Sequence, residues 1–156
     1  MIKNIKYFLI FLFLHGCGYS PIYEVKQKSN FGLNEIVYSG EKNIGREIEK
    51  NLEKFRNNKV KNVFNADFTV SKRQEIVTKD KKGDPSSFKL IIEIQLNLID
   101  KTNNKILERK FVKDTTFDSM DNKFELDQYI KNIEKNMIFK IIQDINIFFN
   151  IIENDI

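Results

Sequence analysis

Apolar and polar residues alternate most regularly over residues 88–98. Because successive side chains of a strand point to opposite faces, this period of two predicts a long strand with one wholly apolar face and one mixed face. The apolar face is expected to carry Phe88, Leu90, Ile92, Ile94, Leu96 and Leu98. Less regular runs predict three more strands, at 35–38, from 66 to about 78, and from 106 to about 116.

Two other segments repeat their apolar residues at helical spacing. Residues 41–57 place Ile44, Ile48, Leu52 and Phe55 on one side of a helix. From about 121 to 152 a broad apolar stripe predicts a second helix, about 45 Å long at 1.5 Å per residue. That length exceeds what a small sheet needs, so we expect its end to project or to meet a partner. The stripe holds Leu126, Ile130, Ile133, Met137, Ile141, Ile145, Phe148 and Ile152, widened by Tyr129, Ile138, Ile142 and Phe149.

The order of these elements predicts the fold class. A strand, a helix, three strands and a helix favour an α+β two-layer sandwich, with a mostly antiparallel four-stranded sheet and both helices packed on one face. Polar connections at 79–87 and 100–105 should join the last three strands into a meander. No internal repeat or second domain is evident, so residues 17–156 are expected to form a single domain.

The chain begins with the pattern of a secretory signal. Lys3 and Lys6 precede the apolar run 7–14, which is too short to span a bilayer core of about 30 Å. The run ends at Leu14-His15-Gly16-Cys17, whose spacing is that of a bacterial lipobox, although His15 is bulkier than the usual small residue. Residues 1–16 are therefore expected to be a lipoprotein signal peptide.

Cys17 is the only cysteine of the chain and the predicted lipidation site. Its thiol would take a diacylglycerol and its new amine an acyl chain, which together hold a domain durably on a membrane. Gly18 replaces the aspartate that commonly retains lipoproteins at the inner membrane, which points to the outer membrane. Residues 17–30 would form a lipidated tether. The alternative is an ordinary cleaved signal with an incidental thiol.

Composition narrows the classes of function. Removal of Lys3 and Lys6 with the signal lowers Lys+Arg from 26 to 24, against 22 Asp+Glu, so the mature chain is nearly neutral. Charges of both signs alternate and no basic block with aromatics appears, so no nucleic-acid partner is expected. His15, the single histidine, leaves with the signal, which removes His-based triads and zinc sites built on His or Cys. We therefore expect no enzyme, no metal and no cofactor beyond the acyl chains.

The residues that follow the lipobox resemble a known family. Cys17-Gly18-Tyr19-Ser20-Pro21-Ile22-Tyr23 resembles the start of mature LptE, the lipopolysaccharide-assembly lipoprotein, especially in its alphaproteobacterial forms. The stretch from Gly83 to Phe88, followed by Leu96-x-Leu98-x-Asp100, is similar to the family's polar turn and long central strand. Ser87 departs from the pattern, since many members carry an arginine near that position.

The resemblance implies an outer-membrane lipoprotein whose domain sits inside the LptD β-barrel, as plug and assembly factor for lipopolysaccharide. Two alternatives stay open: an accessory lipoprotein of another envelope system, such as a cell-wall synthase activator or a transporter subunit, and a carboxylate-based periplasmic hydrolase.

A cluster of cations is the candidate ligand site. These side chains surround the predicted turn between the second and third strands, where they could meet lipid A phosphates as charge-assisted pairs. A solvated turn without a ligand is the preferred interpretation. The candidates are Lys72, Arg73, Lys79, Lys81 and Lys82.

Overall fold

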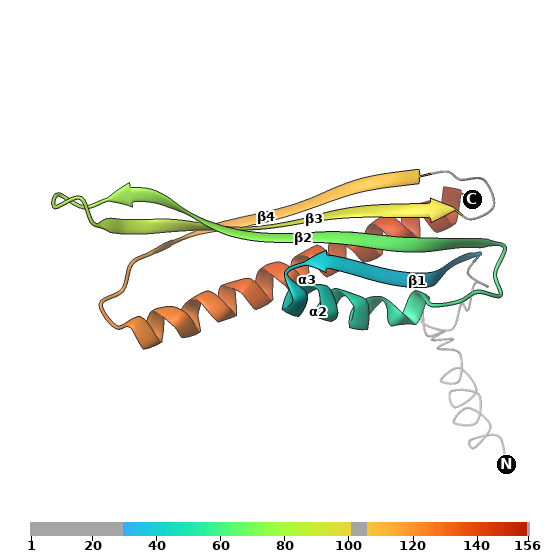
Figure 1. Cartoon of the computed structure of the whole chain (residues 1–156), viewed down its shortest axis with the longest axis horizontal. Helices are drawn as coiled ribbons and strands as arrows, with labels where there is room; N and C mark the ends of the chain where they lie inside the picture. Colours follow the sequence, from blue (N-terminus) through green and yellow to red (C-terminus); the bar gives the residue numbers. More distant parts are fainter. Residues whose placement is uncertain (1–29, 101–105, 156) are drawn as a thin grey trace, which may run out of the picture.

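The computed structural model describes residues 30–100 and 106–155 as a sheet with two helices on one side (Figure 1). Cys17, the tether up to residue 29 and most of the 100–105 connection lie outside the described residues. The sheet order is β1-β2-β3-β4. The predicted α+β fold is thereby confirmed. The elements are β1 (Phe31–Gly40), α2 (Lys42–Leu52), a 3-10 turn (Glu53–Phe55), β2 (Asn62–Lys79), β3 (Pro85–Asp100), β4 (Ile106–Asp118) and α3 (Lys123–Asp155).

The central strand β3 has the predicted alternation. Leu90, Ile92, Ile94, Leu96 and Leu98 are buried under the helices, while Phe88 is partly buried against the same core. β3 pairs antiparallel with β2 and with β4, so the three strands form the predicted meander. The opposite face is largely wet. Ile91 and Ser87 are exceptions, because both are buried on that face.

The first pair of strands differs from a fully antiparallel sheet. β1 runs parallel to β2, and α2 forms the crossover connection between them. β1 is also longer than the predicted 35–38. A register shift between Leu33 and Glu35 moves the buried positions from Phe31 and Leu33 to Ile36, which breaks the alternation that marks a strand in the sequence.

The helix α2 covers β1 and β2. Ile44, Ile48 and Leu52 are buried on its inner side, as predicted. Gly45 lets the helix approach β1 closely, since a Cβ there would lie 2.2 Å from the Tyr38 ring. The α-helix ends earlier than expected, at Leu52.

The helix α3 is 33 residues long, about 50 Å at 1.5 Å per residue. Its buried residues all lie from Met137 to Ile152, whereas Leu126, Ile130 and Ile133 are only partly buried. Tyr129 was expected to widen the apolar stripe. Its side chain is 43% exposed, so this part of the widened stripe is not buried in the core. Figure 1 shows why: the first turns of α3 lie beneath the long β2–β3 hairpin, beyond the part of the sheet that β1 and α2 cover.

No helix within the described residues is both long enough and apolar enough to cross a membrane.

Candidate functional site

The tip of the β2–β3 hairpin is built around Asp80. Its side-chain oxygen accepts hydrogen bonds from the backbone N–H groups of Lys82 (2.8 Å) and Asp84 (2.9 Å). Its backbone N–H donates to the carbonyl of Asp84, and its carbonyl accepts from Gly83. Gly83 has φ +92, a conformation that other residues rarely adopt. The tip is therefore a fixed turn held by its own hydrogen bonds.

Three of the predicted cations lie at this tip. Lys79 ends β2, while Lys81 and Lys82 lie in the turn, and all three are exposed. No residue in the described part of the chain forms an ion pair with their ammonium groups. These three lysines are the part of the predicted cluster that remains available to an anion.

The other two predicted cations lie elsewhere. At about 3.3 Å per residue, Lys72 is roughly 23 Å from Lys79 along β2. Lys72 points toward the helices and pairs with Glu134 of α3 at 3.1 Å. Its neighbour Arg73 points to the opposite face of the sheet, because successive residues of a strand alternate. The structure does not bring the five residues together, and their proposed contact with phosphate stays a prediction.

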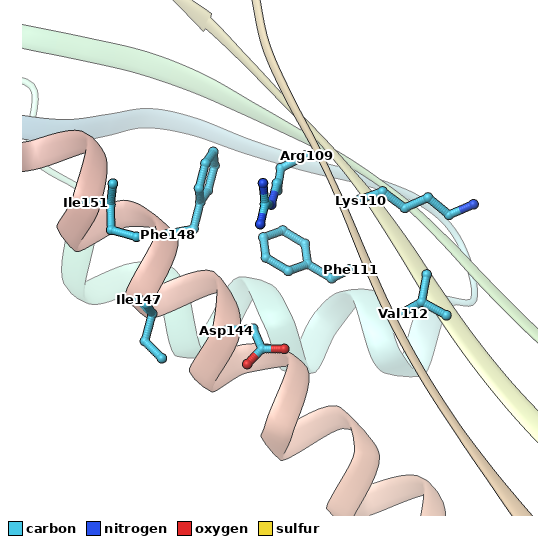
Figure 2. Close-up of a pocket in the computed structure, with 8 residues that line it drawn as sticks. All are labelled: Arg109, Lys110, Phe111, Val112, Asp144, Ile147, Phe148 and Ile151. Atoms are coloured by element: carbon cyan, nitrogen blue, oxygen red, sulfur yellow. The ribbon is translucent and has the colours of Figure 1, made fainter. Parts of the chain in front are cut away.

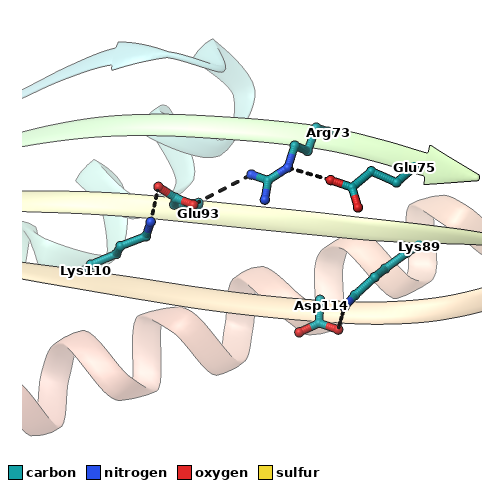
Figure 3. Close-up of polar contacts among 6 residues, drawn as sticks. All are labelled: Arg73, Glu75, Lys89, Glu93, Lys110 and Asp114. Carbon is teal, nitrogen blue, oxygen red and sulfur yellow. Dashed lines mark hydrogen bonds and ion pairs between the residues drawn. The ribbon is translucent and has the colours of Figure 1, made fainter.

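The sheet surface turned away from α2 and α3, here called the open face, carries a chain of ion pairs (Figure 3). Glu93 of β3 accepts from Lys110 of β4 at 2.7 Å and lies 3.6 Å from Arg73 of β2. Arg73 also contacts Glu75 at 3.0 Å. The hydrogen bond from Lys110, helped by the charges of Lys110 and Arg73, lowers the pKa of Glu93 below its usual value of 4.5.

Further toward the hairpin tip the open face continues in the same way. Lys89 of β3 pairs with Asp114 of β4 at 3.0 Å. Ser87 is buried, and its hydroxyl lies 2.7 Å from that of Thr78. Ser87 therefore joins β3 to β2 and presents no charge to a ligand.

A groove of about 330 Å³ separates β4 from the C-terminal half of α3 (Figure 2). Arg109 and Phe111 point from β4 toward the helix, while Lys110 and Val112 point away from it. Arg109 lies over the Phe148 ring, 5.7 Å from its centroid. The groove is lined by Arg109, Lys110, Phe111, Val112, Asp144, Ile147, Phe148 and Ile151.

The chemistry of this groove argues against the hydrolase alternative at this place. Asp144 is the one carboxylate among its lining residues, and it is held by Lys113 at 2.7 Å. Acid–base hydrolysis needs a second group of different protonation state nearby. Across residues 30–100 and 106–155, no group of three or more acidic, His or Cys side chains could hold a metal ion.

Comparisons of sequence identify no relative: no family model matches the chain, and no curated protein matches it. Comparisons with solved structures find proteins of similar fold. Rare lipoprotein B from Shewanella oneidensis superposes with a TM-score of 0.52 at 12% identity, over 77% of this chain and 99% of that one. A putative lipoprotein from Caulobacter crescentus gives 0.51 at 13% identity, over 78% and 90%.

A minor lipoprotein from Acinetobacter baumannii gives a TM-score of 0.51 at 11% identity, over 78% of this chain and 94% of that one. At such low identities the similarity shows the fold and not the activity. The described domain thus has a fold that solved bacterial lipoproteins also have.

Proposed function

We propose that this chain is an LptE-like outer-membrane lipoprotein that plugs the LptD β-barrel and helps to assemble it for lipopolysaccharide insertion into the outer leaflet. Acyl chains on Cys17 would anchor it, with the domain facing the periplasm and the barrel lumen. The role is non-enzymatic. One agreement carries the proposal: residues 17–23 resemble the start of mature LptE, and the domain that follows has a fold shared with solved lipoproteins.

The surface of the sheet is compatible with a position inside the lumen of a β-barrel. Lumens of outer-membrane barrels are polar. The open face is polar, and four of its charges are paired across the strands, Glu93 with Lys110 and Asp114 with Lys89. These pairs can lie against a polar wall with each of their charges still compensated.

The dimensions of the domain support the same arrangement. β3 has 16 residues, about 53 Å at 3.3 Å per residue, and α3 is of similar length. A bilayer core is about 30 Å thick. A domain standing along the barrel axis would therefore fill the membrane-spanning part of the lumen and reach beyond it on at least one side.

The proposal also includes a candidate contact with lipopolysaccharide, and its candidate residues are now those at the hairpin tip. Lys79, Lys81 and Lys82 could meet phosphates there as charge-assisted pairs. Lys72 and Arg73 already have partners within the chain. The preferred interpretation is still a solvated tip without a ligand, because the turn is complete through the bonds that Asp80 makes.

The proposal is tested by a pull-down of the tagged full chain from its own membranes in mild detergent, with mass spectrometry of the partners. We expect one large outer-membrane barrel protein in near-equal amount. A Cys17→Ala chain is the control for the anchor, because a barrel that still co-purifies with it is held by the domain and not by shared membrane.

Recovery of lipidated chain without a barrel protein would contradict the plug. Recovery of a cell-wall synthase or a transporter would favour the accessory lipoprotein of another envelope system.

A further inference from the structure

The two edges of the sheet are built differently. β1 is shifted in register between Leu33 and Glu35, and its start is covered by Arg56 and Asn57. The backbone N–H of Asn57 donates to the carbonyl of Leu33 at 3.0 Å. Bulges and covering segments of this kind stop an edge from pairing with another chain.

Among residues 30–100 and 106–155, neither a bulge nor a covering segment protects the β4 edge. β4 is 13 residues long, its register with β3 is unbroken from Ile106 to Asp118, and no described strand lies beyond it. A long regular edge presents a row of backbone N–H and C=O groups that another strand can bind. The question is which strand fits.

We propose that the β4 edge pairs with the β4 edge of a second copy of this chain, antiparallel and across a two-fold axis at Val112. Val112 is the middle residue of β4, so this register pairs the whole strand, with Ile106 opposite Asp118 of the copy. Such an interface joins two four-stranded sheets into one, with the helices of both copies on the same side.

The charges of β4 select this register. With Val112 opposite itself, Lys110 of each copy lies opposite Asp114 of the other, and opposite charges in such pairs are stabilising. Glu108 lies opposite Thr116, and Arg109 lies opposite Thr115. The arrangement therefore places no like charges opposite each other.

Neighbouring two-fold registers fail this test. Centres at Lys110, Lys113 or Asp114 place that charge opposite itself. A centre at Phe111 places Glu108 opposite Asp114, and Arg109 opposite Lys113. Like charges directly opposite each other destabilise a pair of strands. Within residues 110–114, Val112 is thus the centre that combines full overlap with complementary charge.

The pairing would also extend the ion pairs of the open face (Figure 3). Within one chain Lys110 is bound to Glu93 at 2.7 Å and Asp114 to Lys89 at 3.0 Å. Pairing of Lys110 with Asp114 of the copy joins these contacts into one row of alternating sign. The row runs from Arg73 through Glu93 and Lys110 to the other copy's Asp114 and Lys89.

Apolar side chains beside the β4 edge also favour a second copy of the chain as the partner. Val112, at the axis, is 43% exposed. Ile147 and Ile151 line the adjoining groove of α3 and are 58% and 52% exposed (Figure 2). A second copy would remove water from Val112 and approach these helix residues. The inference concerns the chain outside any barrel and does not rest on the proposed function.

Disulfide trapping of the lipidated full chain in detergent tests the register. Directly opposite Cβ atoms lie about 4.5–5.5 Å apart, close to the separation in a disulfide. Val112→Cys should therefore give a covalent dimer under mild oxidation. Thr116→Cys is the matched control, because it is exposed on the same face of β4 but would lie about 27 Å from its copy. The parent chain, which lacks the introduced cysteine, shows whether any disulfide forms through Cys17.

Charge reversal tests the same interface without a disulfide. Lys110→Asp should raise the dimer dissociation constant about tenfold or more in analytical ultracentrifugation, because it affects two symmetric pairs. Adding Asp114→Lys should restore it to within about threefold. Arg73→Glu is the control: it also disturbs Glu93, but it lies on β2 away from the edge, so the dissociation constant should not change.

The proposal would be overturned if Val112→Cys gave no dimer, if Thr116→Cys gave as much dimer, or if Lys110→Asp had no effect. A link from Val112→Cys to a different protein would also overturn it and would assign the β4 edge to that protein.

Discussion

Glu93 is the residue at which the charges of three strands meet. Its carboxylate is stabilised first by the hydrogen bond from Lys110, so its pKa lies below the usual 4.5. Because the pKa is lowered in the folded state, the stabilisation is present above the usual pKa and is lost as the pH falls through the folded value. We predict that Lys110→Met raises the pKa of Glu93, measured by carboxyl carbon NMR across a pH titration.

Lys89→Met is the matched control for this prediction. Lys89 is also a lysine of the open face, but it pairs with Asp114 and not with Glu93. The pKa of Glu93 should stay where it is in that variant. An unchanged pKa in Lys110→Met, or an equal rise in both variants, would show that the hydrogen bond from Lys110 is not the main cause.

The sequence indicated the cations of the candidate site but not their grouping. Lys72 and Arg73 are neighbours in the chain, yet they lie on opposite faces of β2 and bind different elements, α3 and β3. Because side chains alternate along a strand, the sequence in principle places Lys72 and Arg73 on opposite faces. The register that brings Glu134 to Lys72 depends on tertiary packing, and no local pattern of residues contains it.

At the scale of elements, α3 consists of two unlike halves. Ile141 is fully buried, whereas Ile130 is only partly buried against the same core. Removal of a fully buried isoleucine side chain costs about 2–5 kcal/mol, and less where the site is open to water. We predict that Ile141→Ala lowers the free energy of unfolding by about 3 kcal/mol and Ile130→Ala by about 1 kcal/mol, measured by urea denaturation.

The two substitutions control each other, since both remove the same atoms from the same helix. Equal losses would mean that the first half of α3 is packed as firmly as the second, contrary to the exposure of its side chains. The difference also indicates which half is free to meet a partner.

The hairpin tip is an element whose chemistry can be tested alone. Replacing Lys79, Lys81 and Lys82 together by serine leaves the turn bonds of Asp80 in place, since those use backbone N–H groups. We expect lipopolysaccharide binding to stay within about twofold of the parent in a pull-down with biotinylated lipopolysaccharide, because exposed cations at a solvated tip contribute little.

A clear loss of binding would reverse that preference and assign the phosphate contact to the tip. Lys42→Ser with Lys50→Ser and Lys140→Ser, all exposed and away from the hairpin, controls for loss of net positive charge.

Element prediction succeeded where one period runs unbroken and failed where a bulge interrupts it. The alternation from Phe88 to Leu98 identified β3 and its buried face. The start of β1 was missed, because the register shift after Leu33 moves the buried side chains from odd to even positions. α2 was placed correctly through Ile44, Ile48 and Leu52, but its last turn was not, since Phe55 continues the helical spacing in a 3-10 turn.

At the scale of the whole molecule, element order predicted the two layers, and the fold of solved lipoproteins agrees with it. The order of the elements did not predict the direction of β1. A helix between two strands can connect them as parallel neighbours or as antiparallel neighbours. The parallel pair of β1 and β2 comes with close packing of α2 on β1, where Gly45 lies against the Tyr38 ring.

A plug differs from a protein docked on a surface because its partner surrounds it. Photo-crosslinking in living cells tests that difference, with the reactive residue placed singly at Ser71 on the open face, at Lys50 on α2 and at Lys140 on α3. All three positions are exposed; Ser71 lies on the open face of the sheet, and Lys50 and Lys140 lie on the helices of the opposite layer. We predict that each links the chain to the same outer-membrane barrel protein. Links from one side only, or to no barrel protein at all, would contradict the proposed plug.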